Sequence, residues 1–189
     1  MIEKKNFTTI IIFICAIAFS FWFIAVSKSI INKKNSSQSY NIFIDSVKVT
    51  QLNKIGKSKD ILTATKVFDY TQKNKTNFNN PFITHYVPNA PPWHITAKHG
   101  QSINNNTTII LQDHVKVHQL AGLNSQNLTL TTTKLTYYPK KSLIITHQPV
   151  VITQPGSIMH AHGMKMDLNK NIVTFISNVH GQYGKISRK

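Results

Sequence analysis

The chain has 189 residues, and roughly 150 of them follow an apolar N-terminal segment, which is enough to bury the core of one ordinary domain. Lysine and arginine total 22 against 6 acidic residues, so the net charge is +16. With so few carboxylates, catalysis by a carboxylate pair is disfavoured. A polyanionic partner and simple solubility both explain this charge. The only cysteine, Cys15, excludes an intramolecular disulfide.

An uncharged apolar segment covers residues 7–26. About 20 residues at roughly 1.5 Å each match the ~30 Å hydrocarbon core of a bilayer, so the segment predicts one transmembrane helix. A cleaved signal peptide is the alternative, because Ala16-Ile17-Ala18 and Ala25-Val26-Ser27 resemble cleavage sites. The apolar run continues past the first of these sites through Phe19 and Trp22, which favours an uncleaved anchor containing both aromatic residues.

The segments around this helix complete the predicted organisation. Residues 1–6 form a short N-terminus, and residues 27–40 are polar without apolar periodicity, which is typical of a tether. A folded domain is expected over residues 41–184, followed by a basic tail at residues 185–189.

Apolar residues of the folded part recur with period two, which indicates half-buried β-strands. Val47 and Val49 alternate with Lys48 and Thr50. Further sets that we expect to share one face of a strand are Leu62, Ala64, Phe68 and Tyr70; Trp93, Ile95 and Ala97; Ile109, Leu111, Val115 and Val117; Leu128 and Leu130; Ile158, Met164, Met166 and Leu168; and Val173 and Phe175. No window after residue 40 has a helical stripe.

Turn-forming clusters rich in Asn, Pro and Gly separate these runs at intervals of roughly 8 to 15 residues. The pattern predicts an antiparallel sandwich, barrel or jellyroll and excludes a parallel α/β architecture. Unless such a sheet closes fully, its edge strands can accept a strand from another chain.

The chemistry-bearing residues indicate neither an enzyme nor a cofactor. His114 and His118 would stand about 13 Å apart on a strand, too far to share a metal ion. His160 and His162 could approach one ion, but no cysteine or carboxylate lies close in sequence to complete a site. The phosphate-binding, dinucleotide-binding and hydrolase motifs are missing from the sequence.

Nucleic-acid binding is also disfavoured. A single-strand binder interleaves aromatic and basic residues on an exposed face. Here Phe68, Phe82, Trp93 and Phe175 fall on the apolar side of their strands, so we expect no nucleic-acid partner.

Five motifs in order resemble the LptC family, the membrane-anchored component of bacterial lipopolysaccharide export. They are the Pro-Trp strand Pro91–Ala97, the His-Val element within Ile109–Val117, the threonine-rich strand Leu130–Tyr137, the turn Thr146–Val150 and the Gly-Met stretch Gly163–Met166. The resemblance covers nearly the whole chain and departs only at the short basic C-terminus.

The resemblance implies an all-β fold, an open antiparallel β-jellyroll of the LptA-like type, preceded by one N-terminal transmembrane helix in the inner membrane. It implies that residues 1–6 are a short cytoplasmic N-terminus, that the domain is periplasmic and that its apolar interior holds the acyl chains of lipopolysaccharide. The implied partners are the inner-membrane ABC transporter complex, through the N-terminal strands and the transmembrane helix, and a periplasmic LptA-like jellyroll protein, through the C-terminal edge. No cofactor is expected, because the transporter hydrolyses ATP.

Strand parity and the motifs together predict the residues that face the lipid. They are Val47, Val49, Phe78, Phe82, Trp93, Ile95, Ile109, Leu111, Leu128, Leu130, Met164, Met166 and Phe175. Parity assigns a face and not a ligand, so each of these is equally explained as ordinary core. The rival interpretation of the whole protein is a membrane-anchored β-sandwich adaptor that binds an anionic polymer or another protein and has no lipid lumen.

Overall fold

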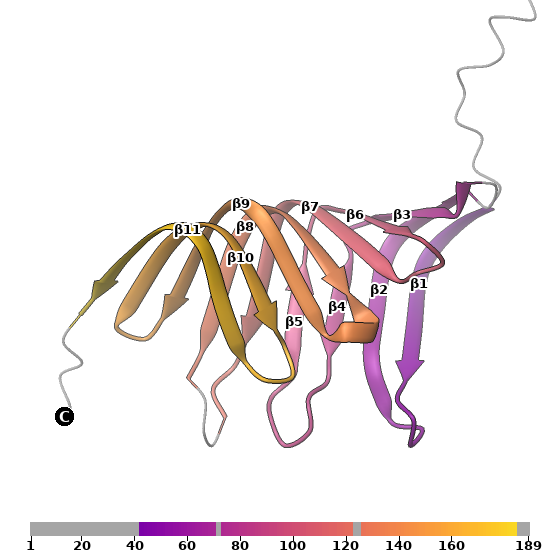
Figure 1. Cartoon of the computed structure of the whole chain (residues 1–189). Coiled ribbons are helices and arrows are strands. Elements are labelled where there is room, and N and C mark those ends of the chain that lie inside the picture. The colour runs from indigo at the N-terminus through magenta and orange to yellow at the C-terminus, as the bar shows by residue number, and fades with distance from the viewer. Residues whose placement is uncertain (1–41, 71–72, 123–125, 185–189) are drawn as a thin grey trace, which may run out of the picture. The chain divides into compact units, whose positions relative to one another are not determined.

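The computed structural model describes residues 42–70, 73–122 and 126–184, all within one compact unit (Tyr40–Lys189). Eleven strands form one antiparallel sheet, and Figure 1 shows β1 and β2 at one end and β10 and β11 at the other. The strands are β1 (Ile42–Leu52), β2 (Ser58–Tyr70), β3 (Lys75–Asn79), β4 (Phe82–His85), β5 (Trp93–Thr96), β6 (His99–Ile103), β7 (Thr108–Gln119), β8 (Leu128–Tyr138), β9 (Leu143–Gln154), β10 (Ser157–Asp167) and β11 (Ile172–Tyr183). The prediction of an all-β antiparallel fold is confirmed.

The sheet divides between β2 and β7. The first half of β2 pairs with β4, which continues through β5 to the second half of β7. The second half of β2 pairs with β3, which continues through β6 to the first half of β7. Two half-sheets therefore diverge from the same pair of long strands and leave space between them.

The long strands β7 to β11 also bend at their centres, where the pairing register shifts. At the bend, some backbone carbonyls lose their partner on the neighbouring strand, and two buried threonine hydroxyls donate hydrogen bonds to such carbonyls instead. The Thr132 hydroxyl donates to the Pro149 carbonyl at 2.9 Å, and the Thr146 hydroxyl donates to the Lys134 carbonyl at 2.7 Å. A buried carbonyl without a donor would be costly, so the threonine-rich sequence suits the bend.

Two predicted face assignments are wrong because the inward alternation reverses partway along β2 and β10. In β2, Leu62 and Ala64 face inward, but the inward positions then move to Val67 and Asp69. Phe68 therefore lies on the opposite face, with its ring centroid 5.2 Å from that of Phe43.

The second reversal is in β10, at Gly163, which has a φ of +78°. Before Gly163 the inward residues are Met159 and Ala161, and after it they are Met164 and Met166. Ile158 is therefore exposed instead of sharing the inner face with the later methionines.

The main hydrophobic core is formed by side chains of β4, β5 and β7 to β10, and Val173 and Phe175 of β11 pack against it. Its fully buried members include Trp93, Leu130, Met164 and Met166. The Trp93 indole N–H donates to the Leu168 carbonyl at 3.1 Å, across 75 residues of sequence, and thereby ties β5 to the end of β10. A smaller cluster of Ala64, Val67 and Phe78 lies beside β1.

The predicted anchor (7–26, with Phe19 and Trp22), the tether (27–40) and the basic tail (185–189) lie outside the described residues. Among the residues that are described, no helix has the length and apolar character to span a bilayer.

Candidate functional site

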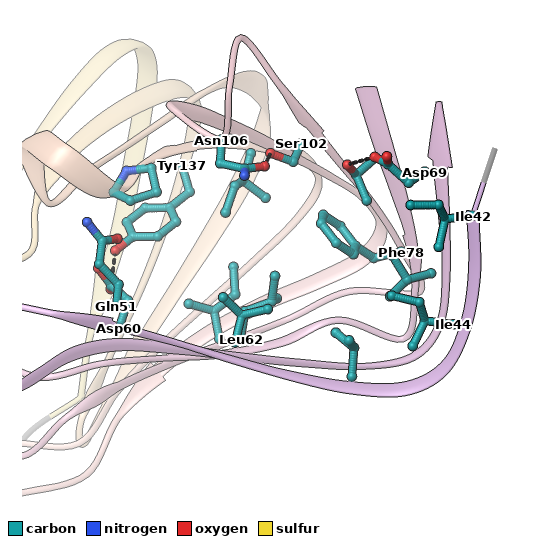
Figure 2. A pocket seen from close by; sticks show the side chains of 17 residues that line it. Ile42, Ile44, Gln51, Asp60, Leu62, Asp69, Phe78, Ser102, Asn106 and Tyr137 are labelled. Carbon is teal, nitrogen blue, oxygen red and sulfur yellow. Dashed lines mark hydrogen bonds between the residues drawn. The ribbon is translucent and has the colours of Figure 1, made fainter. Parts of the chain in front are cut away.

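The clearest candidate site is an apolar pocket of about 360 Å³ at the N-terminal end of the sheet (Figure 2). It lies between β1 and β2 on one side and β3, β6, β7 and β8 on the other. The residues that line it are Ile42, Ile44, Val47, Val49, Gln51, Asp60, Leu62, Val67, Asp69, Thr76, Phe78, Ile83, Ser102, Asn106, Ile109, Tyr137 and Pro139. Ligand pockets commonly measure roughly 300–1,000 Å³, so this one suits a slender apolar group.

Strand β1 supplies five lining residues because its alternation reverses at Ser46, which has a φ of +58°. Ile42 and Ile44 face the pocket before this residue, and Val47 and Val49 face it after. An unbroken alternation would have turned one of these pairs outward.

The pocket is open along β1, which pairs with β2 alone among the described strands. The exposed fractions of Ile42 and Val49 are 49% and 51%, although both line the pocket. Phe78, on the far side of the pocket, is only 5% exposed. Apolar side chains exposed in a groove usually mark a binding surface, because water contact with them is unfavourable.

One end of the pocket is polar. The Tyr137 hydroxyl donates to Asp60 Oδ1 at 2.5 Å, and His85 Nδ1 lies 2.7 Å from the same oxygen. His85 Nε2 lies 3.3 Å from Asn169 Oδ1. Figure 2 shows Gln51, Asp60 and Tyr137 grouped at this end, with Leu62 between them and Phe78.

The polar group is buried and joins β2, β4 and β8. His85, Tyr137 and Asp60 are 0%, 1% and 6% exposed. Burial, and then the negative charge of Asp60, raises the pKa of Tyr137 far above its usual value, so the phenol remains a hydrogen-bond donor. Asp60 Oδ2 is buried and has no hydrogen-bond partner in the described part of the chain.

Four of the predicted lipid-facing residues line this pocket: Val47, Val49, Phe78 and Ile109. Most of the others are packed in the hydrophobic core: Trp93, Ile95, Leu111, Leu128, Leu130, Met164 and Met166 are buried there, and Phe175 packs against it. Their inward direction is as predicted.

Phe82 is placed wrongly by the prediction. Its side chain is 38% exposed, does not line the pocket and lies against the His94 ring at a centroid distance of 5.4 Å. The next residue, Ile83, takes the inward position on the short strand β4, so Phe82 faces outward.

Sequence reasoning missed Asp60, His85 and Tyr137. They lie on three strands, separated by 25 and 52 residues, and no motif joins them. Of the three, only Asp60 could have been noticed in the sequence. It is one of only 6 acidic residues, and it shares the alternate positions of its strand with the apolar Leu62 and Ala64.

The far end of the sheet offers a second surface. Strand β11 pairs only with β10 among the described strands, and it exposes Ile172, Ile176, Val179 and Tyr183. An apolar edge strand with unpaired backbone groups can accept a strand from another protein. No three metal-ligating side chains converge anywhere in the described residues.

A comparison with protein-family models shows to which family the chain is related. The model described as "Lipopolysaccharide-assembly, LptC-related" matches residues 9–184. The chain belongs to the LptC family. Its role is therefore in lipopolysaccharide transport, and the resemblance to this family is confirmed.

The fold of this LptC-family chain is also similar to a solved structure. That structure is LptH of Pseudomonas aeruginosa, the LptA homologous periplasmic component of the conserved lipopolysaccharide transport device. The TM-score is 0.51 at 8% sequence identity, covering 65% of this chain and 92% of LptH, so the likeness concerns the fold alone. No curated protein matches the chain.

Proposed function

We propose that the pocket beside β1 binds an acyl chain of lipopolysaccharide and that the protein passes this lipid from an inner-membrane ABC transporter to an LptA-like periplasmic protein. The observation that carries the proposal is the open apolar pocket at the N-terminal end of a chain of the LptC family. Each methylene that leaves water contributes about 0.8 kcal/mol, so an acyl chain gains substantially by entering.

The two edges of the sheet suit the two expected partners. The transporter would meet β1 at the pocket end, and residues 7–26 would hold the protein in the inner membrane beside it. The LptA-like protein would add a strand to β11 at the other end, where four large apolar side chains are exposed. The domain would then lie in the periplasm and form part of a continuous path.

The packed interior favours a second candidate, an adaptor that organises partners without holding lipid. Trp93, Leu130, Met164 and Met166 are 0% exposed and fill the path from the pocket toward β11. In the transport proposal, a lipid leaving the pocket must follow the open side of the sheet or displace these side chains. The flexible methionines are the easiest to displace.

Photo-crosslinking in cells distinguishes the two candidates. A photoreactive amino acid at Val49 faces the pocket, and the same group at the neighbouring Lys48 faces outward and serves as the matched control. Lipopolysaccharide adducts at Val49, dependent on the active transporter and absent at Lys48, are expected. A folded protein without adducts at Val49 would favour the adaptor, and adducts at Leu130 would show that the core opens for lipid.

Docking at β11 is tested separately. Val179 has no partner in the register with β10, so Val179→Pro should disturb the outer edge more than the sheet itself. We expect loss of co-purification with the LptA-like partner while adducts at Val49 persist. Retained co-purification would place the docking surface elsewhere.

A further inference from the structure

The unpaired oxygen of Asp60 is the feature of the pocket that an acyl chain alone does not explain. Asp60 lines the pocket, is only 6% exposed, and its Oδ2 has no hydrogen-bond partner among the described residues. Buried carboxylate oxygens are normally hydrogen-bonded, because removing them from water without a donor is unfavourable. A ligand group that donates a hydrogen bond would remove this deficit.

The surroundings of the other oxygen indicate what kind of donor fits. Asp60 Oδ1 already accepts a hydrogen bond from Tyr137 and lies 2.7 Å from His85 Nδ1. His85 Nδ1 and the Tyr137 hydroxyl therefore both lie on Oδ1, and Oδ2 is left as the free acceptor of the carboxylate. One further donor is enough to satisfy Oδ2, and in an apolar pocket a neutral hydroxyl supplies it without bringing in another charge.

The strand register places this acceptor next to apolar lining. Gln51 of β1 lies opposite Asp60 of β2, and the next inward pair is Val49 opposite Leu62. Alternate residues of a strand are about 7 Å apart, so the apolar lining begins within roughly that distance of the carboxylate. An aliphatic chain with one hydroxyl can therefore contact both.

We propose that Asp60 is a specificity-determining residue that accepts a hydrogen bond from a hydroxyl group on the acyl chain, so that the pocket selects hydroxylated chains over plain ones. This inference rests on the proposed function, because it requires an acyl chain in the pocket. Asp60 supplies the acceptor, and His85 and Tyr137 hold it in position. Oδ2 has almost no contact with water, so the carboxylate has to rotate for the hydroxyl to reach it.

The test uses the full-length chain with a photoreactive amino acid at Val49 and three labelled probes. The probes are myristoyl glucosamine, hydroxymyristoyl glucosamine and the methyl ether of the latter, which keeps the oxygen but cannot donate. We expect the hydroxylated probe to be captured at about tenfold lower concentration than the other two, the factor typical of one hydrogen bond to a charged group. Asp60→Asn should reduce this preference to about twofold or less.

A matched variant controls for the loss of a carboxylate. Asp113 is an exposed aspartate outside the pocket, paired with His99 at 2.8 Å, and Asp113→Asn should leave the preference intact. Capture of the plain probe by Asp60→Asn checks that its pocket is formed. If that variant does not fold, the comparison of the hydroxyl with its methyl ether in the unmodified chain still decides the question.

The outcomes separate the inference from the proposed function. Equal capture of all three probes would overturn the role of Asp60 and leave the acyl-chain site standing. Capture of none would overturn both. Preference for the hydroxyl and its ether alike over the plain chain would show that Asp60 does not act as the acceptor.

Discussion

Gly163 reverses the alternation of β10, and Gly163→Ala tests whether that bulge is required for stability. Its φ of +78° lies in the left-handed region, where a Cβ costs about 1–2 kcal/mol. The new Cβ would also lie 2.9 Å from Ile176 Cδ1 and 3.3 Å from the Thr146 carbonyl oxygen. Ile176 is 55% exposed, so its Cδ1 can rotate away. Its Cβ, which would lie 3.2 Å from the new Cβ, and the Thr146 carbonyl can move only with their strands.

The expected loss is therefore about 1–3 kcal/mol in the free energy of unfolding, mostly from the backbone conformation. Without the bulge, Met164 and Met166 would turn outward, so the strand cannot relieve the strain by flattening.

Urea unfolding of the unit Tyr40–Lys189, followed by the fluorescence of Trp93, measures this loss. Gly181→Ala in β11 is the matched control, because its Cβ would meet nothing closer than 3.4 Å and no positive φ applies there. We expect Gly181→Ala to change stability between zero and a gain of about 1 kcal/mol. A Gly163→Ala protein as stable as Gly181→Ala would refute the argument that the bulge depends on glycine.

Three further predictions concern buried polar groups, each measured by denaturant unfolding. Tyr137→Phe should cost about 1.5–3 kcal/mol by removing the bond to Asp60. Because the pKa of Tyr137 is raised, its advantage over phenylalanine should shrink above pH ~10. Burial lowers the pKa of His118, so the parent protein should lose stability relative to His118→Gln as the pH falls below ~6.5. Trp93→Phe, followed by circular dichroism, should cost about 1–3 kcal/mol through the lost bond to the Leu168 carbonyl and a small cavity.

Each of these has a contradicting result. A Tyr137→Phe protein with full stability would mean that the buried carboxylate is satisfied without the phenol. A pH-independent difference between the parent and His118→Gln would exclude the effect of burial on that imidazole. A neutral Trp93→Phe would show that the indole N–H contributes nothing at this position.

Alternation of apolar residues was sufficient to predict strands throughout the folded part. The period of two depends only on neighbouring residues of one strand, so it can be recognised without knowing which strands pair. It failed where the alternation reverses, between Ala64 and Val67 in β2 and at Gly163 in β10. Gly163 has a positive φ, and so does Ser46 of β1, where the inward positions also shift by one residue. Phe82 was misplaced because a strand as short as β4 (Phe82–His85) has too few residues to define a face.

The sequence by itself determined the fold class and, through five ordered motifs, the LptC family, because both depend on residue order along the chain. Only the tertiary structure decided that the pocket lies beside β1 while Trp93 and Leu130 are packed in the core. It also decided that Asp60, His85 and Tyr137 meet. Such contacts depend on how half-sheets diverge and pack across long stretches of sequence, which no local pattern records.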